Sequence, residues 1–438
     1  MNPWALATAG LVVAVYAAVS RRLSTTPFSG PLVFVAGGLA VGPLGLHLTD
    51  LAADPETVRG LLEIALSLVL FTDAAAIRSR QLRVECFLTL RLLTIGLPLT
   101  IAAGWLLAWP MLPGLTVWEC ALVGIILAPT DAALGQQAVA DRRVPALVRH
   151  GLSVESGLND GLVLPFFLLA LAAAGGSHGE QHGPLETFLR ALLLSGAIGC
   201  TAGYLSARVL RSSTARGWNT RGWRQLLTIA VPAIAYPLSA EAQGSGFIAV
   251  WVAGLTFGAF LPIEPPGQEA PVSSGTEVSP VTEFAERLGL LLSLLSFFVF
   301  GAVILGPALQ DLTWQILVYA VLSLTAARML PVAVALVGTG LSPVTVTYVG
   351  WFGPRGLASL VFGLIVYAEH FPKVDLLTHV VALTVGMSVL VHGASAAFLG
   401  SRYGAWYATR RDAGAELREQ MSVPEGSIAV PRGGQDFS

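Results

Sequence analysis

Apolar residues occur along this chain in long, nearly uninterrupted blocks separated by short polar segments. Blocks of about 20 apolar residues match the length of an α-helix that crosses a lipid bilayer, so the pattern predicts about thirteen membrane-spanning helices. The predicted helices cover 3–20, 29–48, 57–77, 88–109, 115–134, 150–174, 188–207, 225–242, 246–263, 286–307, 313–338, 345–369 and 377–399. Only Gln243, Gly244 and Ser245 separate the eighth predicted helix from the ninth.

The composition excludes several classes of protein. Hydrophobic residues make up 54% of the 438 residues and charged residues only 12%, about half the share that a soluble domain carries. We therefore expect an all-α polytopic membrane protein in contact with the lipid bilayer, and not a soluble enzyme. The net charge of −2 gives no basic field that would attract nucleic acid. The three cysteines lack CxxC spacing and predict neither a disulfide framework nor a metal site.

The distribution of arginine predicts the orientation of the helices. Arginines follow the first, third, fifth and seventh predicted helices, whereas the even-numbered connections contain few basic residues. By the positive-inside rule, the odd-numbered connections and the C-terminus are cytoplasmic and the N-terminus faces outside, in a cell membrane. The connection over 264–285 is acidic and rich in proline and serine, but acidic residues contribute little to this rule.

Residues 401–438 form a short polar tail, which we expect to be disordered apart from a helical turn or two around 415–421. The tail is too small for a nucleotide-binding domain, and no GxxxxGK[ST] motif occurs in the chain. The sequence therefore predicts neither ATP-driven transport nor a bound cofactor. His178, Glu180 and His182 lack HExxH spacing and are interpreted as part of an ordinary extracellular loop.

Two segments concentrate polar and ionisable side chains inside predicted membrane helices. They are Pro129-Thr130-Asp131 and Glu155-Ser156-Gly157-Leu158-Asn159-Asp160. A charged side chain at the centre of the bilayer costs on the order of 2.5–3.5 kcal/mol, so such residues mark functional sites. Asp160 has no partner close in the sequence and is the strongest candidate for a functional carboxylate. Asp73, near the end of the third predicted helix, is a further candidate ligand.

Helical geometry separates the acidic and polar side chains of the sixth predicted helix. At about 100° per residue, Ser156 and Asp160 lie on one face, one turn apart, whereas Glu155 points about 140° away from Asp160. Ser156 and Asp160 can therefore share a ligand, and Glu155 is free to face a different helix.

Three arginines in predicted membrane helices need acidic partners. Arg355, in the twelfth predicted helix, is the expected ion-pair partner of Glu155, because neither charge is tolerated alone in lipid. Arg91 and Arg328, in the fourth and eleventh, are expected to be buried partners of acidic groups such as Glu63 or Asp131.

Pro129 and the Gly353-Pro354 step interrupt the fifth and twelfth predicted helices, because proline removes a backbone hydrogen bond. Such breaks occur at membrane depth only where they line protein or a cavity. By the predicted topology the two broken helices run in opposite directions, which is typical of inverted-repeat carriers with a site near the midplane. Freed carbonyls and the Thr130 hydroxyl can coordinate a small cation, while Asp131 and Arg355 can neutralise the exposed helix ends.

These motifs together resemble the bacterial Na⁺/H⁺ antiporters of the monovalent cation–proton antiporter group one, the NhaP-like and animal NHE-like exchangers. The resemblance covers about residues 5–400. Further support comes from Gly353-Pro354-Arg355-Gly356, Gly244-Ser245-Gly246-Phe247, Ala253-Gly254 and Phe297-Phe298-Val299-Phe300-Gly301.

The resemblance implies a homodimer of thirteen-helix protomers with inverted repeats and two broken, crossing helices. Residues 1–400 would form the transmembrane antiporter domain, with core helices over about 88–174 and 313–399 and dimerisation helices over about 3–77 and 188–307. By motif position, Asp160 is implied to carry the ion. The implied further ligands are Asn159, Ser156, Thr130 and Asp73, and the implied structural charges are Glu155, Arg355 and Asp131.

The expected transport mechanism is competition between a proton and a cation for Asp160. Low-dielectric surroundings disfavour the charged carboxylate, so a proton or a cation neutralises it, but not both together. Net transport then becomes an electroneutral, one-for-one exchange of Na⁺ (or Li⁺) for H⁺ by alternating access. K⁺/H⁺ antiport by the same machinery is the alternative, because ligand types alone do not separate Na⁺ from K⁺. Remote alternatives are a Na⁺-coupled solute symporter and an intramembrane aspartyl protease using Asp131 and Asp160, for which the chain lacks a GxGD element.

Overall fold

The computed structural model describes residues 3–23, 26, 28–46, 55–77, 82–175, 183–261, 281–369 and 371–420. This part of the chain is helical without any strand, and each predicted apolar block corresponds to one helix or to two or three consecutive ones. The all-α prediction is therefore confirmed. The predicted loop with His178, Glu180 and His182, and most of 264–285, lie outside the described residues.

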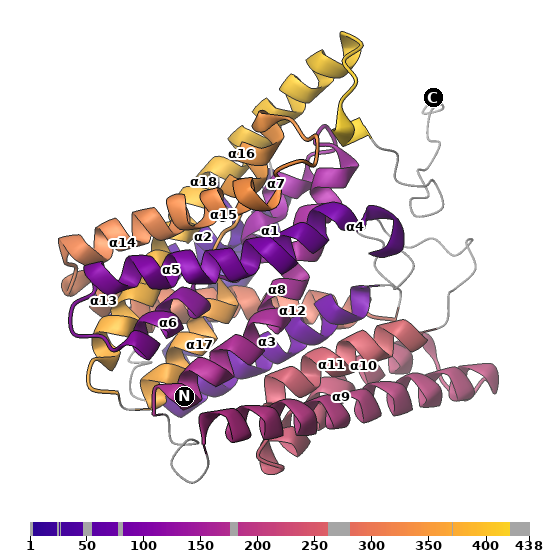
Figure 1. Cartoon of the computed structure of the whole chain (residues 1–438). Coiled ribbons are helices and arrows are strands. Elements are labelled where there is room, and N and C mark those ends of the chain that lie inside the picture. The colour runs from indigo at the N-terminus through magenta and orange to yellow at the C-terminus, as the bar shows by residue number, and fades with distance from the viewer. Residues whose placement is uncertain are drawn as a thin grey trace.

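The helices are described here in the two groups that the resemblance implies, and the blocks over 3–77 and 188–307 give the first set. They are α1 (Pro3–Leu23), α2 (Gly30–Val41), α3 (Pro55–Ala76), α9 (Pro184–Ala215), α10 (Arg221–Glu241), α11 (Gly246–Phe260), α12 (Glu283–Val299), the π-helix η3 (Phe300–Leu305) and α13 (Gly306–Gln310). In Figure 1, α9, α10 and α11 lie side by side, and α11 also packs against α3. Gly254 and Gly258 of α11 allow this contact, because a side chain at either position would overlap the backbone of α3.

The remaining blocks form a second set. They are α4 (Leu82–Arg91), the π-helix η2 (Leu92–Gly96), α5 (Leu97–Met111), α6 (Val117–Ile126), α7 (Ala132–Ala140), α8 (Ala146–Ala173), α14 (Trp314–Leu324), α15 (Ala326–Ala335), α16 (Pro343–Trp351), α17 (Leu357–Ala368) and α18 (Val374–Asp412). The breaks predicted at Pro129 and Gly353-Pro354 are confirmed, because α6 ends before the first and α17 begins after the second.

The lengths of the helices reflect these breaks. Among the described residues, six helical stretches are long and apolar enough to cross a bilayer. Two of them are α8 and α18, and others join consecutive helices such as α14 and α15. Four further apolar helices are shorter, and two of these, α6 and α17, are halves of the broken helices. The polar backbone between the halves therefore lies inside the protein, at the depth where the sequence places the candidate site.

The last membrane helix is longer than predicted. We expected it to end near residue 399, but α18 continues to Asp412. Hydropathy predicts only the apolar part of a helix, whereas packing stabilises the additional turns of α18. Gly400, Tyr403 and Gly404 are buried, and the Tyr403 ring stacks on Tyr348 with ring centroids 4.2 Å apart. The helical turn predicted around 415–421 is confirmed as a 3-10 helix, η4 (Arg418–Gln420).

The tail docks on the start of α16 through Glu419, which is only 2% exposed. Its Oε1 accepts hydrogen bonds from the Ser342 backbone N–H at 2.9 Å and from the Thr345 hydroxyl at 2.5 Å. The neighbouring Arg418 guanidinium lies over the Phe87 ring of α4, 5.5 Å from its centroid. The C-terminal segment is thus tied to two helices of the second set.

The negative charge of Glu419 stabilises its contact with Ser342 and Thr345 at neutral pH. Burial alone would raise the pKa of Glu419, but the Thr345 hydroxyl and the Ser342 N–H outweigh it, so the pKa lies below its usual range. A carboxyl group with a lowered pKa contributes its full stabilisation above the unfolded-state value of about 4.3. The contribution is lost only as the pH falls through the lower, folded-state pKa.

Glu419→Ala should therefore release the tail at pH 7. Hydrogen bonds to a charged group contribute about 1.5–3 kcal/mol, so the Ser342 amide should exchange its hydrogen at least about tenfold faster in the variant. Hydrogen–deuterium exchange of peptides covering Ser342 and 413–420 measures this. Glu416→Ala removes an exposed carboxylate from the same segment and should leave both peptides unchanged. Equal exchange in the Glu419 variant and the parent would contradict the docking role.

Candidate functional site

Asp131 lies at the point where the two broken helices meet. Its Oδ1 accepts the Leu134 N–H of α7 at 3.0 Å, and its Oδ2 accepts the Leu357 N–H of α17 at 2.9 Å. Its own backbone N–H donates to Pro354 O at 2.7 Å, which joins the two interrupted segments directly. One carboxylate therefore caps the N-termini of two half-helices, where the helix dipoles favour negative charge.

Arg355 makes the complementary contacts at the other two helix ends. Its Nη1 donates to Ala128 O at 3.1 Å and Pro129 O at 3.4 Å, just after α6, and to Gly353 O at 3.0 Å, just after α16. The side chain is fully buried, and its positive charge lies where the C-terminal carbonyls are negative. Asp131 and Arg355 thus occupy the helix ends, as the sequence led us to expect.

Gly356 is required by this crossing. A Cβ atom at this position would overlap the Asp131 carboxylate. Only glycine lets Asp131 approach the first N–H groups of α17 so closely.

The polar face of α8 meets the unwound segment at Thr130. The Ser156 hydroxyl donates to Thr130 O at 2.6 Å, and Asn159 Nδ2 donates to the Thr130 hydroxyl at 2.7 Å. Asp160 lies one turn beyond Ser156 and is 8% exposed. In the described part of the chain, Asn159 Oδ1 and Asp160 Oδ1 are buried without a hydrogen-bond donor, and no basic side chain forms an ion pair with Asp160.

Asp73 reaches the same side of α8 from α3. A Cβ atom on Gly157 would lie 3.1 Å from Asp73 Cβ and 3.6 Å from Asp73 Oδ2. Gly157 and Asp160 are three residues apart and therefore share a face of the helix. The structure thus brings Asp73 next to the face that carries Asp160. Thr130, Ser156 and Asn159 gather there as well, so all five residues expected as ligands lie around one part of α8.

The prediction that Glu155 forms an ion pair with Arg355 is wrong. Glu155 instead pairs with Arg328 of α15 through two contacts, 2.7 Å from Nη1 to Oε1 and 2.9 Å from Nη2 to Oε2. Both side chains are almost fully buried, at 2% and 1% exposed. The Nη1 of Arg355 donates to backbone carbonyls instead, whereas its Nε and Nη2 are buried without an acceptor among the described residues. No pattern in the sequence favours carbonyls over a carboxylate at this position.

The other acids proposed for Arg328 also have different partners. Glu63 pairs with Arg59 one turn away on α3, at 2.7 Å. Asp131 accepts backbone N–H groups, among them those of Leu134 and Leu357. Arg91 donates to the carbonyls of Ala335 and Val337, so the expectation of an acidic partner for it is wrong as well. The prediction that Glu155 is free to face another helix is nevertheless confirmed, because its partner Arg328 belongs to α15.

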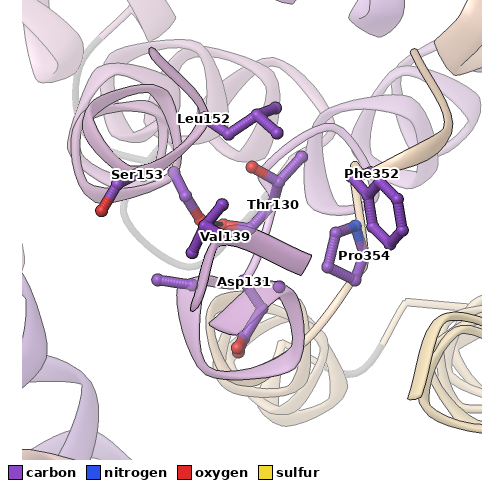
Figure 2. A pocket seen from close by; sticks show the side chains of 10 residues that line it. Thr130, Asp131, Val139, Leu152, Ser153, Phe352 and Pro354 are labelled. Carbon is purple, nitrogen blue, oxygen red and sulfur yellow. Dashed lines mark hydrogen bonds between the residues drawn. The ribbon is translucent and has the colours of Figure 1, made fainter. Parts of the chain in front are cut away.

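A small cavity opens beside the crossing. Figure 2 shows that side chains of both broken helices and of α8 surround it, among them Thr130, Asp131, Ser153, Phe352 and Pro354. Val139, near the C-terminal end of α7, also lines it. The cavity therefore extends along α7 from the candidate ligand Thr130 to Val139.

Sequence reasoning missed several side chains that hold the crossing. The Ser359 hydroxyl donates to Ile126 O, the last residue of α6, at 2.7 Å. Ser388 of α18 accepts the Arg355 backbone N–H at 2.7 Å. Serine is common in membrane helices, so no local signal distinguishes these two. Arg328 was visible as a charge in an apolar block, but its partner lies 173 residues away.

Two broken helices that cross at unwound segments, with a buried carboxylate next to the crossing, define an inverted-repeat membrane carrier. The transmembrane family described as "Sodium/hydrogen exchanger, transmembrane" matches residues 9–402, and the chain belongs to this family. The sodium proton antiporter MjNhaP1 from Methanocaldococcus jannaschii, solved at pH 8, has the same fold. It superposes with a TM-score of 0.73 over 91% of this chain and 98% of that one, at 20% identity.

Curated relatives are more similar in sequence. The K⁺/H⁺ antiporter NhaP of Alkalimonas amylolytica is 25% identical over 370 residues, covering 83% of this chain and 60% of the relative. The K⁺/H⁺ antiporter NhaP2 of Shewanella oneidensis is 26% identical over 403 residues, covering 88% and 65%. The Na⁺/H⁺ antiporter of Saccharomyces cerevisiae is 31% identical over 181 residues, covering 38% and 18%. The chain thus spans 60–65% of the length of the two bacterial relatives.

Proposed function

We propose that this protein is a secondary-active antiporter that exchanges Na⁺ (or Li⁺) for H⁺ across the membrane, with both ions competing for Asp160. The observation that carries the proposal is the set of oxygens around the crossing. Within the described residues Asp160 is buried without a basic partner, and the oxygens of Ser156 and Asn159 lie near it on α8, in contact with Thr130. Family membership and the antiporter relatives support the same reading.

Desolvation supplies the coupling between the two ions. An isolated carboxylate in the protein interior costs several kcal/mol, so the core moves across the apolar barrier readily only when Asp160 is neutralised. One proton or one monovalent cation does this equally well, and each excludes the other. Alternating access to the site then turns a gradient of either ion into movement of the other.

Exchange of K⁺ for H⁺ is the second candidate. It is favoured by the two bacterial relatives described above, both of which are K⁺/H⁺ antiporters. Hydroxyl, amide and carboxylate oxygens bind both Na⁺ and K⁺, and the separation depends on cavity size and field strength.

Purified protein in liposomes loaded with a pH-sensitive dye separates these candidates. Addition of Na⁺, Li⁺ or K⁺ in turn, with choline as the control cation, should dissipate a pH gradient only for transported ions. If the two ions compete, the apparent KM for the cation should rise as the pH falls. In the pH range where the proton occupies the site, the rise should be up to about tenfold per pH unit, since one unit corresponds to about 1.36 kcal/mol. Choline-level dequenching with all three cations would refute antiport.

The exchange should be electroneutral, because Asn159 cannot ionise and Asp160 exchanges one charge for one charge. Solid-supported membrane electrophysiology tests this: a Na⁺ or K⁺ concentration jump that drives proton release should produce no net transported charge. A sustained current that reverses with the direction of the gradient would show that a second carboxylate, such as Asp73, takes part in each cycle.

The arrangement in the membrane follows from the arginine pattern and remains a prediction. We expect a multi-pass protein of the cell membrane with an external N-terminus and a cytoplasmic C-terminus, which also places the docked Glu419 in the cytoplasm. A homodimer, with about 3–77 and 188–307 as dimerisation helices and about 88–174 and 313–399 as the moving core, is proposed from the resemblance. No cofactor and no ATP are expected to be needed.

A further inference from the structure

His392 and Ser388 lie one turn apart on α18, buried against the break between α16 and α17. They are 1% and 0% exposed. His392 Nε2 is 3.1 Å from Trp351 O, at the end of α16, and its Nδ1 is 3.2 Å from Ser388 Oγ. Ser388 Oγ in turn accepts the Arg355 N–H at 2.7 Å. These three contacts connect both sides of the unwound segment 352–356 to α18.

The chemistry of the end groups fixes the direction of the hydrogen bonds. Trp351 O can only accept, so Nε2 of His392 carries the hydrogen and donates to it. In the neutral ring Nδ1 is then an acceptor, and it receives the Ser388 O–H. Ser388 Oγ keeps a lone pair for the Arg355 N–H. Nδ1 is also 3.2 Å from Ser388 O, but two acceptors do not bond.

A second link to α18 strengthens the same end of α16. The Trp351 indole N–H donates to Ser395 Oγ at 3.1 Å, and the indole ring lies 5.3 Å from the His392 ring. The last residue of α16 is therefore held by its backbone and by its side chain.

The segment that is held leads directly to the candidate ion site. Arg355, anchored by its N–H, extends its guanidinium to Ala128 O and Pro129 O. The next residue is Thr130, whose carbonyl and hydroxyl bind Ser156 and Asn159. A shift of the second broken helix would therefore move Thr130 relative to Asp160.

We propose that His392 is a positioning residue for antiport: as a neutral Nε2–H imidazole, it fixes the second unwound segment to α18 and thereby sets the spacing of the oxygens around the transported cation. Both ring nitrogens are used in this role, so His392 is not itself a cation ligand. The proposal rests on the antiport function proposed above, because its effect is on the affinity for the transported cation.

Two amide substitutions of His392 distinguish positioning from simple packing. The Nε2 atom of glutamine occupies about the place of imidazole Nε2 and can donate to Trp351 O, whereas asparagine reaches only the place of Nδ1. His392→Gln should keep the KM for the cation within about threefold of the parent. His392→Asn should raise this KM about tenfold, equivalent to about 1.4 kcal/mol, with little change in Vmax. Both are measured in the proteoliposome assay, with thermal unfolding in detergent to verify folding.

A second measurement does not depend on transport. Hydrogen–deuterium exchange of a peptide covering 352–356 should be faster in the asparagine variant than in the parent, and unchanged in the glutamine variant. If the parent shows no exchange of ions but the peptides behave in this way, the proposed function fails and the positioning contact stands. Equal KM values in all three proteins, a loss of Vmax alone, or equal peptide exchange in the two variants would overturn the role of His392.

Discussion

Replacing Asp160 with asparagine is expected to reduce cation–proton exchange to the level of empty liposomes for Na⁺, Li⁺ and K⁺ alike. Asparagine has nearly the same shape as aspartate, but it neither releases a proton nor supplies the negative charge that holds a cation. The remaining oxygens, from Ser156, Asn159 and Thr130, are uncharged, and those of Ser156 and Thr130 already take part in hydrogen bonds. Dye-loaded proteoliposomes at several pH values measure the loss.

A matched control separates this effect from a general disturbance of charge. Asp311→Asn makes the same chemical change at a side chain that is 69% exposed and lies 3.7 Å from His379. This variant should exchange ions like the parent, and both variants should elute as folded protein in size-exclusion chromatography. Exchange retained by the Asp160 variant would contradict the assignment of the carrier carboxylate.

Glu155→Gln is expected to lower the stability of the folded protein strongly. It leaves the Arg328 guanidinium, which is 1% exposed, without its counter-charge. Removing one partner of a buried ion pair costs about 3–5 kcal/mol, because the other charge then remains buried without compensation. Thermal unfolding in detergent, followed by tryptophan fluorescence, should show this as a markedly lower Tm.

Double variants identify the partner of Glu155. Adding Arg328→Met removes the uncompensated charge and should recover most of the lost stability, since a buried ion pair contributes little beyond an apolar pair of similar volume. Adding Arg355→Met should instead lower the stability further, because Ala128 O, Pro129 O and Gly353 O lose their donor. Rescue by the Arg355 substitution and not by the Arg328 substitution would contradict the pairing in the structure.

The candidate site was predictable to the extent that its signals are local. Asp160 and Ser156 share a helix, so the period of 3.6 residues places them on one face without any tertiary information. Pro129 and Pro354 mark the breaks because each removes a hydrogen bond within its own helix. Asp131 beside the first break was readable as a partner of helix ends for the same reason, although its contact with Leu357 of the second break was not.

The partners of the two buried arginines could not be predicted from local patterns. Arg328 and Arg355 both lie in apolar blocks and both suit Glu155 in charge. Which of the two arginines pairs with Glu155 depends on the rotation and position of α15 and of the unwound segment relative to α8. Arg328 comes from a helix that starts directly after Thr325, where the backbone departs from helical geometry with φ −111° and ψ −87°. Nothing in the composition of the eleventh block indicates where this helix faces.

The all-helical membrane fold, the apolar blocks and the two broken helices could be predicted from the sequence, and Asp160 could be proposed as the ion carrier. Hydropathy, helical period and proline act within about 20 residues, so these signals are local. The pairing of the charges and the division of four helix ends between Asp131 and Arg355 became visible only in the packed structure, as did the contacts of His392 and Glu419 with α16. Those contacts join residues far apart in the chain, and they depend on how the helices rotate and pack, which no local pattern encodes.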